Sequence, residues 1–167
     1  MNYLNIEDDK LMPTIVELNA LLANYHVYYQ NLRNFHWNVL GENFFELHEK
    51  FEELYTDARV KIDEIAERIL TLRYHPMSSL SEYLKISEIK EVKSHKSDRE
   101  MVLAILENHR ILLQKMGSVI EKASEINDEG TIDLIGAYIR ELEKSSWMLD
   151  AFTKKTTSTL KNSAVEA

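Results

Sequence analysis

The sequence has no cysteine and little glycine or proline: four glycines and two prolines among 167 residues. Without cysteine the chain can form neither disulfide bridges nor thiolate metal sites. Because helix-breaking residues are so few and the hydrophobic content is 44%, we expect one compact, helix-rich domain over residues 1–167. Within it we expect a helical bundle over about residues 11–152, flanked by short polar arms at both ends.

Long apolar runs are absent as well. No run approaches the roughly 18 apolar residues that identify a membrane-spanning helix. The first ten residues contain Glu7, Asp8 and Asp9 but a single lysine, whereas a secretory signal needs a basic flank and an apolar centre. These absences predict a cytoplasmic protein that does not contact a membrane.

Apolar residues recur at spacings of three and four in long segments, and this period predicts helices. The segments are residues 13–40, 43–70, 97–126 and 132–152, with a short helical piece at 80–86. The short piece lies inside the long connection between the second and third long helices. The predicted fold class is therefore all-α, a four-helix bundle with one long crossover.

Local signals predict how these helices begin and what connects them. An asparagine or serine followed three residues later by glutamate predicts a capping box at two helix starts, Asn43 with Glu46 and Ser97 with Glu100. Ser79 with Glu82 marks the start of the short helical piece. Residues 127–130 predict a turn, and the alternating charges of residues 85–100 predict a solvated linker. We expect residues 1–10 to form a disordered arm and the tail from residue 153 onward to fray.

Candidate metal ligands lie on and just before the second predicted helix. His48 and Glu52 are four residues apart, Asp63 and Glu67 repeat that spacing, and His36 precedes them near the end of the first helix. Residues four apart project from the same side of a helix. Imidazoles and carboxylates together suit a divalent transition metal such as iron, manganese or zinc. The alternative is that these residues are only the solvated face of an amphipathic helix. Four other histidines have no partner at such a spacing, and we expect them to be surface or ordinarily hydrogen-bonded residues: His26, His75, His95 and His109.

The two ligand pairs cannot bind one metal from a single helix. They are separated by about 22 Å at 1.5 Å rise per residue, whereas ligands converge to about 2 Å from a metal. Either a second helix of the same chain or a second copy of this helix must supply the missing pair. Helical bundles that bind two metal ions within a single subunit carry a Glu-x-x-His motif on each of two helices. This sequence contains no such motif. In the second case, the pairs are symmetric about a point between Asp57 and Ala58, so a two-fold axis there would create two identical sites.

Three segments, NFHWNV, NFFELHEKFEELY and IDEIAERI, closely resemble the Dps proteins (DNA-binding proteins from starved cells), which are mini-ferritins. The resemblance extends over about residues 11–152 and implies a ferritin-like four-helix bundle whose ferroxidase centre lies at a subunit interface. It implies that one subunit contributes three ligands and its two-fold mate contributes two: His36, His48 and Glu52, then Asp63 and Glu67. Position 52 is Glu where many family members have Asp.

The same resemblance implies a function. Two ferrous ions at the shared two-metal site would give two electrons to one hydrogen peroxide, and ferric mineral would collect in a hollow dodecameric shell built from two-fold dimers. Trp37, beside the first ligand, would be a radical sink. Asp128 and Asp133, with a weaker case for Glu129, would line an acidic pore for iron entry. The alternative for these acids is a helix N-terminus whose dipole they complement.

Two other functions compete with iron storage. DNA compaction, which the family name suggests, has little support in a chain of net charge −8 whose tail offers Lys154, Lys155 and Lys161 against Glu166. We therefore expect no appreciable binding to duplex DNA near neutral pH. A purely structural helical oligomer with vestigial ligands is the third possibility, and only iron chemistry separates it from the ferroxidase.

Overall fold

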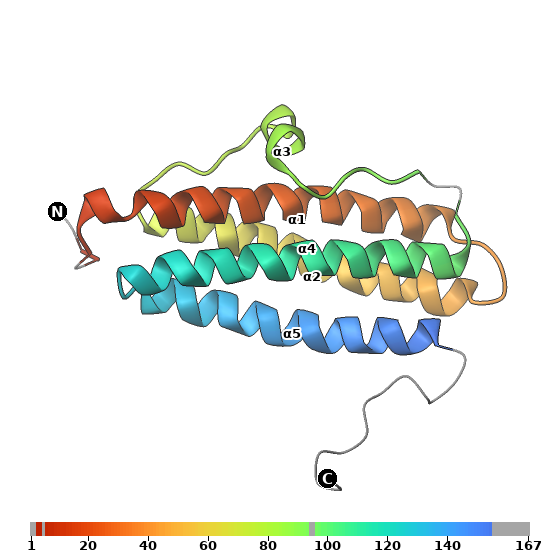
Figure 1. Cartoon of the computed structure of the whole chain (residues 1–167). Coiled ribbons are helices and arrows are strands. Elements are labelled where there is room, and N and C mark those ends of the chain that lie inside the picture. The colour runs from red at the N-terminus through yellow and green to blue at the C-terminus, as the bar shows by residue number, and fades with distance from the viewer. Residues whose placement is uncertain (1–2, 5, 94–95, 155–167) are drawn as a thin grey trace, which may run out of the picture.

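The structure is a computed structural model that describes residues 3–4, 6–93 and 96–154. The described residues form a short 3-10 turn and five helices: η1 (Asp8–Lys10), α1 (Met12–Asn38), α2 (Phe44–Thr71), α3 (Leu80–Ile86), α4 (Asp98–Glu125) and α5 (Glu129–Thr153). The four long helices lie alongside one another, and the crossover from α2 to α4 carries α3 along the outside of α1 (Figure 1). The all-α bundle with an extra short helix is confirmed. Over the part of the chain that the structure describes, none of the helices is both long and apolar enough to cross a membrane.

Helix α1 is the central helix of the bundle. It packs against α2, α4 and α3, so it buries residues around most of its circumference rather than along one stripe. Helix α2 buries a single stripe that recurs at helical spacing, including Leu47, Phe51, Leu54 and Ala58. The other faces of α2 are left free for charged residues. This packing fixes the end of α1 against the start of α2, which is where the candidate ligands lie.

The core contains a directed hydrogen-bond chain that joins three helices. Ser146 Oγ donates to the Leu142 carbonyl (2.7 Å), so it accepts from His109 Nδ1 (2.8 Å). The other ring nitrogen, Nε2, then accepts from the Tyr28 hydroxyl (2.8 Å). Burial first, and then the positive charge of Lys50, lowers the pKa of His109 from 6.5 to about 3. The imidazole is therefore neutral and fully satisfied inside the bundle.

Asparagines on α1 hold the segment that follows α3. The Asn24 side-chain oxygen accepts from the main-chain N–H groups of Glu88 and Ile89, both at 3.0 Å. Asn31 Oδ1 accepts from the main-chain N–H of Val92 at 3.1 Å. The charged side chains of this part of the crossover are exposed, as predicted for a solvated linker, but several of its main-chain N–H groups bind these amide side chains instead of water.

One of the two predicted capping boxes is confirmed. At the start of α4, Ser97 Oγ accepts from the Glu100 N–H (3.4 Å), and the Glu100 carboxylate accepts from the Ser97 N–H (2.8 Å). The side chains of Asn43 and Ser79 make no capping hydrogen bond to their helices. Asn43 instead donates to the carboxylate of Asp98 at 2.5 Å, which ties the start of α2 to the start of α4.

The prediction of a disordered N-terminal arm is wrong for the described part of that arm. Asp8, in η1, forms a two-point ion pair with Arg73 at 2.9 and 3.0 Å. The Tyr3 hydroxyl donates to the carbonyl of Thr71 at 3.1 Å. These contacts hold the arm against the end of α2.

The predicted turn at residues 127–130 is shorter than expected. Asn127 adopts a positive φ of 55°, and α5 already begins at Glu129. The predicted frayed tail is wrong at its first residue, because Thr153 is the buried last residue of α5. The rest of that prediction, from residue 155 onward, lies outside the described residues.

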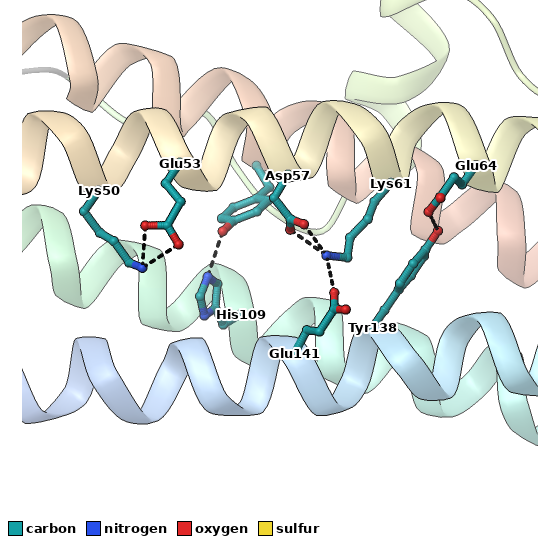
Figure 2. Close-up of polar contacts among 9 residues, drawn as sticks. Lys50, Glu53, Asp57, Lys61, Glu64, His109, Tyr138 and Glu141 are labelled. Atoms are coloured by element: carbon teal, nitrogen blue, oxygen red, sulfur yellow. Dashed lines mark hydrogen bonds and ion pairs between the residues drawn. The ribbon is translucent and has the colours of Figure 1, made fainter.

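A polar seam lies between α2 and α5 (Figure 2). Its cleft has a volume of about 500 Å³, and its charged lining consists of Lys50, Glu53, Asp57, Lys61, Glu141 and Lys144. The ammonium group of Lys61, which is 4% exposed, lies 2.6 Å from both carboxylate oxygens of Asp57 and 2.9 Å from Glu141. The Tyr138 hydroxyl donates to Glu64. The Lys61–Glu141 ion pair and the Tyr138–Glu64 hydrogen bond therefore connect α2 to α5, beside the apolar side chains of Leu54, Leu142 and Met148.

Candidate metal centre

The end of α1 and the start of α2 bring three of the predicted ligands together. His36 comes from the last turns of α1, and His48 and Glu52 come from the first turns of α2. One potential ligand atom of each residue lies within 4.8 Å of the others. His36 is 8% exposed, His48 is half-buried and Glu52 is exposed, so the group opens to the surface. Two imidazoles and a carboxylate in this geometry can hold part of a divalent metal's coordination sphere.

Each imidazole is oriented by the main chain of the other ligand. His36 Nδ1 lies 2.8 Å from the carbonyl oxygen of His48, and His48 Nδ1 lies 2.9 Å from the carbonyl oxygen of His36. A carbonyl oxygen only accepts, so each Nδ1 carries the proton. Both Nε2 atoms are then unprotonated in the neutral rings and free to bind a metal. The two rings stack with centroids 3.8 Å apart.

Aromatic residues that the sequence analysis did not single out surround these ligands. The ring of Phe44 stacks on His48 with centroids 5.1 Å apart, and the edge of Tyr55 meets His36 at 5.3 Å. Burial first, and then the charge of Glu52 and hydrogen bonding to it, raises the pKa of Tyr55. The sequence does contain a signal for Tyr55, because it follows Glu52 by three residues and His48 by seven, which places all three on one helix face.

The other predicted pair lies elsewhere on α2. Asp63 and Glu67 are exposed on its C-terminal half and do not join the first three ligands within one chain. Among the described residues, neither side chain forms an ion pair or a hydrogen bond. Within a single chain the two predicted groups therefore lie apart, as the spacing of the two pairs along one helix requires.

Trp37 lies on the surface next to His36. Its side chain is 60% exposed, and the guanidinium of Arg33 lies 4.7 Å from the centre of its ring. Its assignment as a radical sink stays a prediction.

The acidic residues at the start of α5 occupy different environments. Asp128 is 2% exposed and caps the helix, accepting from Thr131 N (3.2 Å) and Thr131 Oγ1 (2.6 Å). It also pairs with Arg68 at 2.5 Å. Within this chain Asp128 thus fits the alternative reading, a helix N-terminus. Glu129 and Asp133 are exposed. The acidic pore stays a prediction, and the exposed Asp133 fits it better than the buried Asp128 does.

The four other histidines are partly explained by the structure. His109 is satisfied in the core, and His26 stacks on Tyr83 with ring centroids 3.9 Å apart. His75 is exposed, and His95 lies outside the described residues. The expectation of ordinary roles is confirmed for His26 and His109.

Comparisons with known proteins agree with this geometry. The family model described as "Ferritin-like domain" matches residues 15–159. The chain is 45% identical over 135 residues to DNA protection during starvation protein 2 of Bacillus anthracis, covering 81% of this chain and 92% of the relative. It is 40% identical over 150 residues to the DNA protection during starvation protein of Porphyromonas gingivalis, covering 90% and 94%.

A solved structure extends the likeness to three dimensions. The crystal structure of the Dps protein from Vibrio cholerae O1 has a TM-score of 0.89 and 47% identity, covering 92% of this chain and 97% of the other. That protein is described as a member of a broad superfamily of ferritin-like diiron-carboxylate proteins. This chain belongs to the Dps family of ferritin-like proteins.

Proposed function

We propose that this protein captures ferrous iron in the cytoplasm, oxidises it with hydrogen peroxide and stores the ferric product inside a hollow dodecamer. The observation that carries the proposal is the convergence of His36, His48 and Glu52 with both Nε2 atoms free. Hard carboxylate oxygens with borderline imidazole nitrogens suit ferrous iron and still suit the ferric product. The diiron-carboxylate description of the Vibrio cholerae relative supports the same metal.

The two-metal site is completed, in this proposal, by a second subunit. Asp63 and Glu67 have no partner among the described residues, and they lie as far from the two-fold point in α2 as Glu52 and His48 do. An antiparallel partner would place them against the three gathered ligands and create two equivalent sites at one interface. Asp63 and Glu67 would then anchor the better-occupied iron, Glu67 would bridge the two ions, and His48 and Glu52 would complete the second position.

The proposed chemistry consumes iron and peroxide in a fixed ratio. Two ferrous ions each give one electron to one hydrogen peroxide, the O–O bond breaks, and two protons complete two water molecules. Because both electrons arrive together, no hydroxyl radical is released. The ferric ions then leave the site and hydrolyse to an oxyhydroxide mineral inside the shell.

Stopped-flow oxidation of Fe(II) by peroxide under anaerobic conditions tests the proposal. The assembled protein should oxidise two Fe(II) per peroxide faster than the protein-free solution does. Asp63→Asn with Glu67→Gln should abolish that acceleration. A matched control on the same helix is Glu46→Gln with Glu49→Gln, which removes the same charge from exposed residues outside the ligand set and should keep it.

The result that would refute the proposal is equal oxidation by the wild-type protein, by the ligand variant and by the protein-free solution. The assembly state of all samples should be matched by size-exclusion chromatography, because loss of the shell would also slow iron uptake. If the rates are equal and the shells are intact, the remaining interpretations are a purely structural oligomer or a site for another metal.

The relatives are named for the protection of DNA, which does not require contact with it. Removing ferrous iron and peroxide prevents hydroxyl radical formation wherever the DNA lies. With a net charge of −8, we expect no retention of duplex DNA at about 0.15 M salt and neutral pH. A clear gel shift under these conditions would make DNA compaction the better description. Of the basic tail residues, Lys154 is exposed, and Lys155 and Lys161 lie outside the described residues.

A further inference from the structure

The ammonium group of Lys61 lies where carboxylate oxygens from two helices converge (Figure 2). It is 2.6 Å from each carboxylate oxygen of Asp57 on α2 and 2.9 Å from Glu141 on α5. It also lies 5.1 Å from the centre of the Tyr138 ring. The lysine side chain is 5% exposed, whereas those of Asp57 and Glu141 are 52% and 57% exposed. A buried cation is thus held by two carboxylates that line the open cleft of the polar seam.

A third oxygen lies near the same carboxylates. The hydroxyl of Tyr25, which is 1% exposed, makes no hydrogen bond among the described residues. Burial first, then the neighbouring Tyr28, and then the negative charge of Asp57 raise the pKa of Tyr25. Glu141 acts in the same direction, so the hydroxyl lies within electrostatic reach of both carboxylates. A buried polar group without a partner is rare in a folded chain, and this one is close to a position that a cation occupies.

This position also suits a divalent metal ion. Carboxylate and hydroxyl oxygens are the ligands that ions such as Mn(II) and Mg(II) prefer, at about 2.0–2.6 Å. The carboxylate oxygens lie only slightly farther than that from the lysine nitrogen. The cleft of about 500 Å³ leaves room for water molecules that such an ion keeps. The two carboxylates against one ammonium group leave a single negative charge, whereas without Lys61 they would offer the two charges that balance a divalent ion.

We propose that Lys61 excludes divalent metal ions from the space between α2 and α5, so that the carboxylates of the polar seam do not compete with the candidate metal centre. A metal ion at the same point would meet the ammonium charge at contact distance. It could bind only after Lys61 had left both carboxylates, which would move a buried charge away from its partners. Lys61 is therefore a selectivity residue. This exclusion concerns any divalent ion that prefers oxygen ligands, and it does not depend on iron oxidation.

The consequence for iron rests on the proposed function. The candidate metal centre combines imidazole nitrogens with a carboxylate, whereas the position of Lys61 offers oxygen atoms alone. An all-oxygen site favours the harder ferric ion over the ferrous ion. Iron that was oxidised between α2 and α5 would therefore stay bound to the helices and would not continue to the mineral. By occupying this position, Lys61 keeps ferrous iron available to the candidate metal centre.

Equilibrium dialysis of the assembled full chain against Mn(II), with the bound metal counted by mass spectrometry, tests the exclusion. Lys61→Ala vacates the position and should bind one more Mn(II) per subunit than the wild-type protein does. Lys61→Met keeps the apolar stem of the side chain and should gain the same ion, so the test does not depend on the folding of a single variant. Adding Asp57→Asn with Glu141→Gln to Lys61→Ala should remove the additional ion.

Two further variants are matched controls. Lys61→Arg keeps a cation between the helices and should bind no more Mn(II) than the wild-type protein. Lys144→Ala removes the same charge from an exposed lysine of the same cleft and should also leave the count unchanged. The inference is overturned if assembled Lys61→Ala and Lys61→Met gain no ion, if Lys144→Ala gains one too, or if the additional ion persists without the two carboxylates.

The iron assay separates this inference from the proposed function. After Fe(II) oxidation by peroxide and removal of loosely bound iron with a chelator, Lys61→Ala should retain one more ferric ion per subunit than the wild-type protein. If the wild-type protein fails to accelerate the oxidation, the proposed function fails, and the Mn(II) counts still decide whether Lys61 excludes metal. If oxidation is accelerated but the Mn(II) counts of all the variants equal that of the wild-type protein, only the inference on Lys61 fails.

Discussion

Helix α2 contributes carboxylates to two regions, the α2–α5 seam and the candidate metal centre. The carboxylates of the two regions differ in whether they have a partner within the chain. In the seam, Asp57 pairs with Lys61 and Glu64 accepts from Tyr138. In the candidate centre, Asp63 and Glu67 have no ion pair or hydrogen bond among the described residues. The two kinds alternate along one short stretch of helix. A carboxylate with a partner in its own chain stabilises the subunit, whereas one without a partner is available to a cation.

The largest stability effect should come from the buried ion pair at the end of the seam. Arg68→Ala removes the cation from Asp128, whose side chain is 1% exposed, and should lower the free energy of unfolding by about 3 kcal/mol. Asp128→Asn keeps a side-chain oxygen that can cap the helix, and the charge it leaves unpaired is that of Arg68, whose side chain is 18% exposed. It should therefore lower the free energy of unfolding by only about 1 kcal/mol. Urea unfolding at fixed protein concentration measures both. Equal losses would show that burial does not set the cost.

The pH dependence of stability extends the comparison to the histidines. Both ring nitrogens of His109 form hydrogen bonds within the chain, whereas His36 and His48 each have one ring nitrogen without a hydrogen bond among the described residues. The pKa of His109 is lowered from 6.5 to about 3, chiefly by burial. As the pH falls below about 6.5, the unfolded chain takes up a proton here and the folded chain does not, so stability decreases until about pH 3. The loss is at most about 1.4 kcal/mol per pH unit, or roughly 2 kcal/mol between pH 6.5 and 5.

The variant that tests this is His109→Gln, which should lower that part of the pH slope. Urea midpoints between pH 7 and 5 would then converge for the variant and wild-type proteins as the pH falls. Parallel curves would mean that the unfolded chain gains no proton at this residue relative to the folded one.

A smaller effect is expected at Lys61. Lys61→Met removes a buried ammonium, but its partners Asp57 and Glu141 have side chains that are 52% and 57% exposed and can be hydrated instead. We expect a loss of about 1 kcal/mol in the free energy of unfolding. Lys144→Met, an exposed lysine of the same seam with no ion pair among the described residues, is the control and should change nothing measurable. A loss above that for Arg68→Ala would contradict the ranking.

The smallest stability change is expected where the proposed chemistry is most sensitive. Asp63→Asn with Glu67→Gln should alter the free energy of unfolding by less than about 0.5 kcal/mol, because neither exposed carboxylate loses a partner. Asp57→Asn with Glu64→Gln should do the reverse, lowering stability while the acceleration of iron oxidation persists. Thermal unfolding and the stopped-flow assay on both double variants measure the two effects. If both pairs affect both quantities alike, the distinction between the regions is lost.

The helices could be predicted because their apolar period depends on residues close together in the sequence. The expected helix at residues 43–70 is observed at Phe44–Thr71, and the short helix Leu80–Ile86 has the expected limits. The grouping of His48 with Glu52 follows from the same period, and His36 joins them because a short loop returns the chain.

Contacts between distant segments could not be predicted in this way. Asn24 and Asn31 gave no sign that they would bind a segment about sixty residues away, because an asparagine in a helix does not specify its partner. Arg68 likewise lies sixty positions from Asp128. The sequence around Asp128 shows only neighbouring acids and gives no sign that an arginine on another helix pairs with it. The proposed completion of the metal centre by a second chain could be predicted only from the symmetric spacing of the two ligand pairs in α2.

The paired contacts between each imidazole and the other residue's main-chain carbonyl have a consequence for evolution. Side chains that orient ligands elsewhere can be lost by point substitution, but His36 and His48 are oriented by groups that every amino acid carries. Neutral drift at neighbouring positions therefore cannot remove this orientation. Only a change in the path of the backbone can do so, for instance a different length of the connection at residues 39–43. Across descendants of this gene, the length of that connection should vary less than the identity of its residues.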